Sequence, residues 1–302
     1  MSRLRLPPSF LIALVALVSF GLLLLRSRPL ERFNAASEAL LYASGLSAPR
    51  ALYSLDDGTI LAVEGTGPAA RVVEIGVDGA KRPVSSAPPA LTLPDVAAGE
   101  STLPFPRLGT AWSVARAPDG AALAALPLSN RVVRLEADGT QRILAESFTG
   151  TAGRNPLPVA VAVSPAGDLH VALFSTDAGR IASGQVVRLA AGGRREVAFD
   201  GLTLPIGLGF GPGGQLFVLE LARGIDPRSG QAVPKTGRLL ALGPAAHQRR
   251  TIARDLDLPG GLVFTPAGDA YLTERAFPPA LEAGSALLLR LPSGELAPTS
   301  TG

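Results

Sequence analysis

Short apolar runs recur along most of the chain, and turns rich in glycine and proline separate them. Five segments follow one order: an apolar strand, a turn of the Pro-x-Gly type, a second apolar strand, a variable loop and a third strand. The turns are Asp56-Asp57-Gly58, Pro118-Asp119-Gly120, Pro165-Ala166-Gly167, Pro212-Gly213-Gly214 and Pro266-Ala267-Gly268. Successive turn glycines are 62, 47, 47 and 54 residues apart. This spacing predicts many short strands joined by tight turns.

The third strand of each segment repeats as clearly as the turn. Its copies are RVVEI (71–75), RVVRL (131–135), QVVRL (185–189), RLLAL (238–242) and LLLRL (287–291). Three or four strands in a period of about 40 to 50 residues are typical of propeller blades. The strands are apolar on both faces, as expected where blades stack face to face. We therefore predict an all-β fold, a β-propeller of four-stranded blades over residues 38–295.

The ring needs a fourth strand for its last blade. The final repeat ends near residue 291, and residues 296–302 form a polar tail. Residues 38–45 (EALLYASG) precede the first repeat and resemble outer-strand segments such as QRILAES. We predict that they complete the last blade, which leaves no full-length open edge at the seam. Residues 82–107 hold six prolines and are interpreted as a long loop. This gives five blades, with a sixth, degenerate blade in the loop as the alternative.

The N-terminal segment differs from the rest of the chain. Residues 10–25 carry no charge, and arginines flank them on both sides. A spanning helix needs about 20 apolar residues, and flanking arginines can snorkel. No cleavage site follows closely, so we favour an uncleaved transmembrane signal anchor in residues 1–32 over a cleaved signal peptide. Since a long domain behind one N-terminal span is usually translocated, we expect a single-pass protein of the cytoplasmic membrane with an extracytoplasmic propeller.

Charge and cysteine content exclude several function classes. The 28 basic and 25 acidic residues give a net charge of +3, and the chain has no cysteine. So small a basic excess argues against a nucleic-acid partner. The absence of cysteine excludes disulfides, cysteine-ligated zinc and thiol catalysis.

One polar position repeats among the apolar strands. The sixth residue after the turn glycine is Glu64, Glu220 or Glu274 in three segments, and Leu126 or Leu173 in the other two. It ends the second strand, on the face where propellers usually bind ligands. We therefore take the three glutamates as candidate ligand-binding residues.

Two interpretations of the glutamates stay open. In the first, each accepts backbone N–H bonds or pairs with an arginine of the next blade, and Arg223 and Arg275 lie close in sequence. In the second, Glu64, Glu220 and Glu274 converge near the axis around a hard cation such as Ca²⁺. We favour the first.

The remaining polar residues give no catalytic set. His170 shares the register of Phe217 and Tyr271, a core position, whereas His247 lies in a polar segment. Trp112 is expected in the core. No Ser/His/Asp arrangement or G-x-S-x-G motif is present. Three further loop residues are candidates for a ligand pocket, although turn chemistry also explains them: Asn130, Asn155 and Asp177.

The chain resembles propellers of the broad NHL and SMP-30/gluconolactonase type, and more narrowly the ScyD/ScyE-like propellers associated with scytonemin gene clusters. The segments that carry the resemblance are GQLFVLELARG (214–224), GRLLAL (237–242) and RRTIARDLDLPGGLVFTPAGDAYLTE (249–274). The similarity spans about residues 45–291. It implies an extracytoplasmic propeller in a family whose biochemical activity is poorly defined.

The function predicted from these features is a binding module for a protein or a small ligand. The alternative is a metal-dependent lactonase of the SMP-30 kind, in which Glu, Asn and Asp hold a divalent cation. The chain departs from that pattern, because no E-G-P precedes the first blade and no N-D-G stands in the middle. A quinone-dependent sugar dehydrogenase ranks lowest: residues 261–277 resemble its opening blade, but no histidine is placed as the base.

Overall fold

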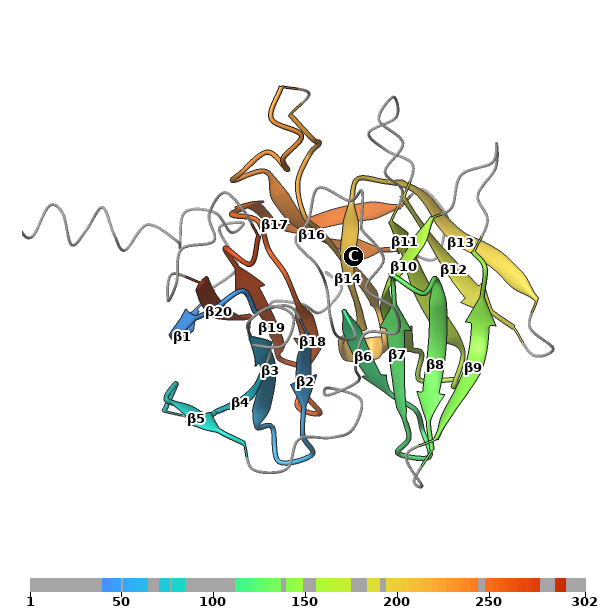
Figure 1. The fold of residues 1–302 in the computed structure, drawn as a ribbon, viewed down its shortest axis with the longest axis horizontal. Coiled ribbons are helices and arrows are strands. Elements are labelled where there is room, and N and C mark those ends of the chain that lie inside the picture. Colours follow the sequence, from blue (N-terminus) through green and yellow to red (C-terminus); the bar gives the residue numbers. More distant parts are fainter. Residues whose placement is uncertain are drawn as a thin grey trace, which may run out of the picture.

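Five four-stranded antiparallel sheets surround a common axis in the computed structural model of the chain (Figure 1). The residues that it describes are 40–49, 51–64, 71–76, 78–84, 112–136, 140–148, 156–174, 184–190, 194–226, 228–243, 248–277 and 286–291. The predicted propeller of five four-stranded blades is confirmed. Among these residues no sixth sheet occurs.

Each blade consists of four strands in order from the axis outwards. Blade 1 contains β2 (Leu52–Ser54), β3 (Ile60–Glu64), β4 (Arg71–Ile75) and β5 (Lys81–Pro83). Blade 2 contains β6 (Ser113–Arg116), β7 (Ala122–Leu126), β8 (Arg131–Leu135) and β9 (Gln141–Glu146). Blade 3 contains β10 (Leu157–Val163), β11 (Leu169–Phe174), β12 (Gly184–Leu189) and β13 (Arg195–Leu202). Blade 4 contains β14 (Pro205–Phe210), β15 (Leu216–Glu220), β16 (Gly237–Leu242) and β17 (Arg249–Leu256). Blade 5 contains β18 (Leu262–Phe264), β19 (Ala270–Glu274), β20 (Ala286–Leu291) and β1 (Leu40–Leu46).

The turn between the first two strands explains the repeated glycine. The third turn residue has a positive φ in every blade, from 74° to 90°. Glycine reaches this region without the steric cost that a Cβ imposes. The glycines are Gly58, Gly120, Gly167, Gly214 and Gly268.

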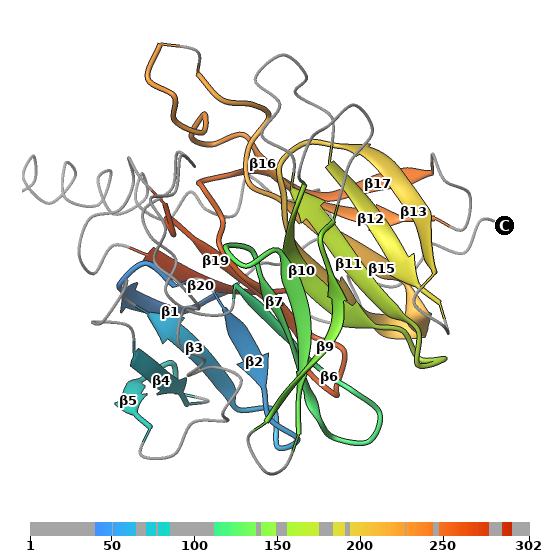
Figure 2. The ribbon, with the colours of Figure 1, turned by 45° about the vertical axis from the view of Figure 1, so that its right-hand side comes forward.

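The N-terminal strand closes the ring, as the sequence predicts. β1 pairs antiparallel with β20, from Leu40 opposite Arg290 to Leu46 opposite Ala286. The inner strands β2, β6, β10, β14 and β18 contact one another in that order, and β18 contacts β2 again. Figure 2 shows β1 beside β20 and close to blade 1. Thr273 of blade 5 adds a hydrogen bond to the Pro49 carbonyl across the seam (3.3 Å).

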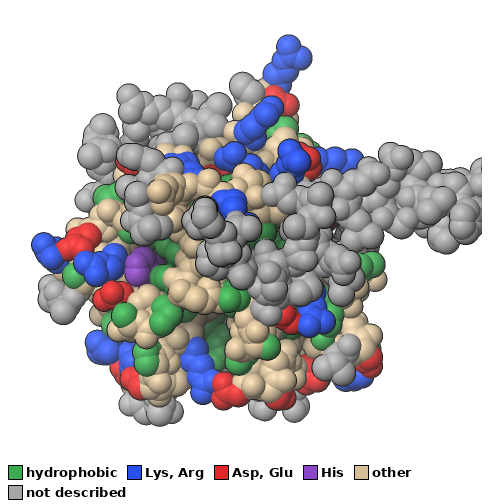
Figure 3. All heavy atoms as spheres, turned by 180° about the vertical axis from the view of Figure 1, so that it is seen from behind, with side chains coloured by type: hydrophobic (Ala, Val, Ile, Leu, Met, Phe, Trp, Pro, Cys, Tyr) green, Lys and Arg blue, Asp and Glu red, His purple; other side chains and the backbone are tan. Residues whose placement is uncertain are grey.

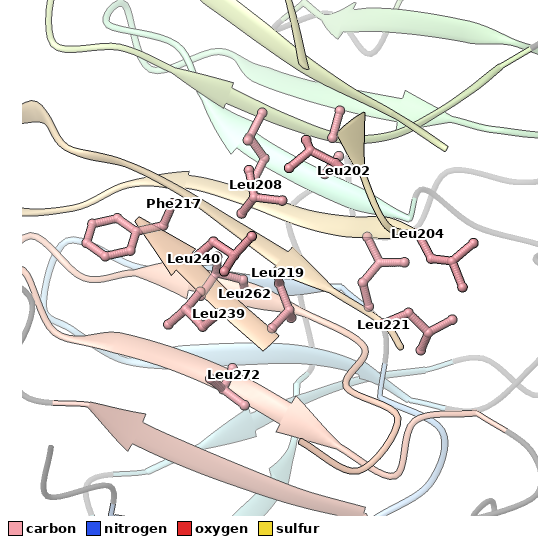
Figure 4. Packing of buried hydrophobic residues seen from close by; sticks show 14 of the residues in the cluster. Leu202, Leu204, Leu208, Phe217, Leu219, Leu221, Leu239, Leu240, Leu262 and Leu272 are labelled. Atoms are coloured by element: carbon pink, nitrogen blue, oxygen red, sulfur yellow. The ribbon is translucent and has the colours of Figure 1, made fainter. Parts of the chain in front are cut away.

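The core lies between blades, because the second strands are buried on both faces. All five residues of β3, β15 and β19 are buried. Figure 4 shows the cluster around blade 4, in which Leu219 and Leu240 lie near Leu262 and Leu272 of blade 5. Burying apolar area contributes roughly 25 cal/mol per Å². A single blade would leave these strand faces exposed to water. Stacking the blades buries them and so stabilises the ring.

Basic residues that begin the outer strands connect neighbouring blades at the outside of the ring. Lys81 Nζ donates to the Gly45 carbonyl (2.9 Å), joining blade 1 to blade 5. Arg195 donates to carbonyls at the end of β9, and Arg249 donates to the Gly201 carbonyl at the end of β13 (2.8 Å). We call these three contacts the outer clasps. Each is a hydrogen bond from a basic side chain to a backbone carbonyl at or near the end of the outer strand of the neighbouring blade.

Charged side chains at the surface are largely paired. Figure 3 shows basic and acidic groups next to each other on one side of the molecule. The pairs include Arg134–Asp119 (2.6 Å), Arg188–Glu196 (2.5 Å) and Arg290–Asp269 (2.5 Å).

Several sequence predictions concern residues outside the described ranges. The proposed anchor (1–32) and the polar tail (296–302) lie outside them. No helix in the described part of the chain is long and apolar enough to span a membrane. The loop predicted at 82–107 begins too early, because Arg82 and Pro83 pair with β4 as part of β5. Residues 85–111 are not described.

Candidate functional site

The three repeated glutamates are buried at the ends of their strands. Glu64 ends β3, Glu220 ends β15 and Glu274 ends β19, and each is only 1% exposed. A buried carboxylate is costly unless charges or hydrogen bonds compensate it. The contacts of each glutamate therefore indicate its role.

Each carboxylate accepts a hydrogen bond from the backbone N–H of the residue 17 positions earlier. The donor–acceptor pairs are Ser47 N–Glu64 Oε2 (3.1 Å), Thr203 N–Glu220 Oε1 (2.7 Å) and Asp257 N–Glu274 Oε1 (2.9 Å). The donors lie in the connections between the outer strand of one blade and the inner strand of the next. The glutamates therefore bind consecutive blades together.

Two glutamates also pair with the arginine opposite them in the third strand. Arg71 Nε lies 2.9 Å from Glu64 Oε1, and Arg238 Nε lies 2.9 Å from Glu220 Oε2. Lys81 Nζ is 3.2 Å from Glu64 Oε2. Burial raises the pKa of the Glu64 carboxyl, but the bonds from Arg71, Ser47 and Lys81 outweigh burial, so this pKa lies below its ordinary value. Glu64 is therefore an ionised, fully engaged carboxylate at neutral pH.

The arginines suggested by sequence proximity are not the partners. Arg275 Nε lies 3.4 Å from Oδ2 of Asp257, the residue whose backbone N–H donates to Glu274. The backbone N–H of Arg223 donates to Thr236 Oγ1. Proximity along the chain was the wrong criterion here. In an antiparallel sheet, the side chain opposite a glutamate on the neighbouring strand lies closer to it than the side chain that follows it in sequence.

The geometry favours the blade-connecting interpretation over the shared cation. Glu64, Glu220 and Glu274 each bind the backbone beside their own blade. Among the described residues, no group of three His, Asp or Glu side chains could hold a metal ion.

The other candidate residues divide into three cases. Asn130 holds the segment that leaves its own blade after β9: its Nδ2 donates to the Phe148 carbonyl and its Oδ1 accepts from the Phe148 N–H, both at 3.3 Å. His170 is buried against Phe210, with ring centroids 5.1 Å apart. Burial lowers its pKa. Trp112 is buried in the core, as expected. Asn155, Asp177 and His247 lie outside the described residues.

A sequence signal for the glutamate contacts exists in the connections between blades. The segments Leu46-Ser47-Ala48-Pro49, Leu202-Thr203-Leu204-Pro205 and Leu256-Asp257-Leu258-Pro259 share the pattern L-x-x-P, and the second residue of each is the N–H donor. In blade 3 the residue 17 positions before Leu173 is Pro156, which has no N–H. Donor and acceptor are therefore both absent in that blade.

The described residues form a cavity of about 210 Å³ on the axis of the ring. All five inner strands line it, mostly with aliphatic and aromatic side chains such as Val163, Phe210 and Phe264. Tyr53 and Arg116 supply its polar side chains together with a serine. The lining residues lie in the parts of the inner strands that lead into the Pro-x-Gly turns, at the end of the ring opposite the glutamates. The sequence instead predicts the ligand-binding face at the glutamate end.

Comparison with known proteins establishes the fold. No protein-family model and no curated protein matches the chain. The structure is similar to the quinone-bound aldose sugar dehydrogenase of Streptomyces coelicolor, with a TM-score of 0.52, 18% identity and coverage of 86% of this chain and 99% of that one. A glucose dehydrogenase-type oxidoreductase of Thermus thermophilus gives 0.49 at 20% identity, covering 84% and 99%. A gluconolactonase of Xanthomonas campestris gives 0.46 at 15% identity, covering 88% and 92%. At these identities the likeness concerns the fold alone.

Proposed function

We propose that the chain is a membrane-tethered propeller that binds a small ligand in its axial cavity. The supporting observation is the composition of the cavity, which receives a wall from every blade. A site built from five strands is rigid, and rigidity reduces the entropy lost on binding. The three buried glutamates are engaged in joining blades, so they do not serve as the cation ligands of the lactonase alternative.

The cavity suggests the chemistry of the ligand. Its volume of about 210 Å³ exceeds the roughly 150 Å³ that accommodates benzene and is smaller than a typical drug site of about 300 Å³. Tyr53 is a neutral phenol at physiological pH, and burial raises its pKa further above the ordinary value. Arg116 forms an ion pair with Asp56. A fragment-sized molecule with an apolar body and one polar group fits this lining.

A fragment screen on the full-length chain tests the axial site. Fragments that bind should lose affinity in Val163→Phe, because Val163 lines the axial cavity as well as another cavity between blades 2 and 3. Val197→Phe, on the exposed outer strand of the same blade, is the matched control and should bind normally. Equal binding by wild type and Val163→Phe would exclude the axial site. Hydrolysis of lactones that requires added Ca²⁺, Mg²⁺ or Mn²⁺ would instead favour the lactonase alternative.

The tether and its orientation belong to the same proposal. They are supported by the apolar segment 10–25 and by the resemblance to ScyD/ScyE-like propellers. Protease added to intact cells should digest the propeller while the membrane stays closed. A domain that is cut only after lysis would place the ring on the cytoplasmic side.

A further inference from the structure

A second cavity lies away from the axis, where blade 5 meets blade 1. Its volume is about 570 Å³, within the range of roughly 300 to 1,000 Å³ typical of small-molecule sites. Turn residues 56–58 and 265–267 line one part, and Tyr42, Tyr271 and Arg290 line another. We call it the seam cavity. It shares no lining residue with the axial cavity.

Two tyrosines distinguish the seam cavity from its counterpart elsewhere in the ring. Tyr42 and Tyr271 pack edge to face, with centroids 4.9 Å apart. A smaller cavity of about 350 Å³ lies between blades 2 and 3, and there Leu123 and Leu144 occupy the matching strand positions. Leucine therefore suffices for packing at these positions. The chain has three tyrosines in all, so two of them at one cavity call for a reason beyond packing.

The carboxylates of the seam cavity differ in their pairing. Asp56 is paired with Arg116, and Asp269 receives two bonds from Arg290 (2.9 and 2.5 Å). Asp57 accepts the Thr59 N–H at 2.9 Å and has no ion-pair partner in the part of the chain that the structure describes.

The repeat explains why no arginine or lysine in the described ranges pairs with Asp57. Asp119 occupies the same turn position in blade 2 and pairs with Arg134 of its own third strand (2.6 Å). In blade 1 the residue that matches Arg134 is Glu74, as their strand registers show. Asp57 is exposed, and no described cation of the chain pairs with it, so its carboxylate is available to a cation supplied from outside the chain. Its hydrogen bond to Thr59 lowers its pKa, so it is ionised at neutral pH.

We propose that the seam cavity binds a small organic cation, an ammonium group on an apolar body. The ammonium pairs with Asp57, and the tyrosine pair contacts the apolar body. Carboxylates and aromatic rings are the groups that recognise ammonium ions in proteins. An anion is disfavoured, because Arg290, the cation in the lining, is already occupied by Asp269.

Calorimetric titration of the full-length chain in an uncharged detergent tests the proposal. The probes are benzylammonium and tetramethylammonium, with benzyl alcohol and benzoate as neutral and anionic controls. We expect saturable binding of at least one cation and none of the controls. Asp57→Asn should weaken that binding about tenfold, and Tyr42→Leu, which introduces the residue found between blades 2 and 3, should weaken it at least threefold.

Two variants make the result specific. Asp119→Asn changes the same turn position in the next blade and should leave the affinity unchanged. Val163→Phe, a change in the lining of the axial cavity that lies outside the seam cavity, should also leave it unchanged, so failure of one site is distinguishable from failure of the other. Equal binding of benzylammonium and benzyl alcohol, no binding of either cation, or an unchanged affinity in Asp57→Asn would overturn the proposal.

Discussion

At the scale of single residues, Glu220 shows how a buried charge becomes a connector. It joins Thr203 of one connection to Arg238 of its own blade. Removing such a carboxylate leaves a buried N–H and a guanidinium without their partner. That loss, rather than the net strength of the bonds, determines the effect of a substitution.

Replacement of Glu220 by Leu should therefore lower the free energy of unfolding by about 2 to 3 kcal/mol. Blade 3, with Pro156 and Leu173, suggests the compensating change. In a Thr203→Pro background the N–H is absent, so Glu220→Leu should cost less than it does in the wild type. Urea denaturation of the four proteins in this cycle measures the coupling. Strictly additive effects would show that the Thr203 contact contributes nothing.

The pH dependence of stability belongs to Glu64. Its lowered pKa means that its stabilising contribution is complete above the ordinary glutamate pKa of about 4.3 and is lost as the pH falls through the lower value of the folded state. Glu64→Gln does not titrate. The difference in melting temperature between wild type and Glu64→Gln should therefore shrink between about pH 6 and pH 3. A difference that stays constant would mean that the carboxylate is not ionised in the fold.

At the scale of strands and turns, the sequence predicts those features that recur in every copy of the repeat. A glycine with positive φ and an apolar strand follow from patterns within about 50 residues, and the completion of the last blade by β1 follows because residues 38–45 resemble the outer strands of the repeat. The partners of the glutamates are harder to predict from sequence. They depend on which residues face each other in the second and third strands and on the path of the connection between two blades. Sequence proximity pointed to Arg275, whereas the L-x-x-P pattern 17 residues earlier was the informative signal for Asp257 and its counterparts.

The outer clasps are also a property of elements, because each joins the start of one outer strand to the end of another. Arg249→Ala should lower the free energy of unfolding by about 0.5 to 1 kcal/mol, since the hydrogen bonds to the Gly201 and Asp200 carbonyls are lost. Arg249→Lys is the matched control, because Lys81 makes the equivalent contact in blade 1. Urea denaturation should rank Lys close to wild type and above Ala. The reverse order would assign the effect to packing of the arginine stem.

At the scale of the whole molecule, closure of the ring depends on one strand from the far end of the chain. β1 supplies buried Ala43 and Leu46 to blade 5, and the residue after it, Ser47, holds Glu64. Without β1, the edge of β20 is open and part of the seam core faces water. An open edge of this kind pairs readily with other chains. Closure by the N-terminal strand therefore couples the integrity of the ring to its first residues.

A pair of truncations tests this coupling. A chain that lacks residues 1–39 keeps β1 and should remain monomeric with a single cooperative thermal transition. A chain that lacks residues 1–46 loses β1, and we expect it to melt at least several degrees lower and to associate through the exposed edge of β20. Size-exclusion chromatography and circular dichroism of the two proteins provide the comparison. Equal melting temperatures would show that four complete blades and a three-stranded fifth are enough, so that β1 serves mainly to connect the ring to the segment before it.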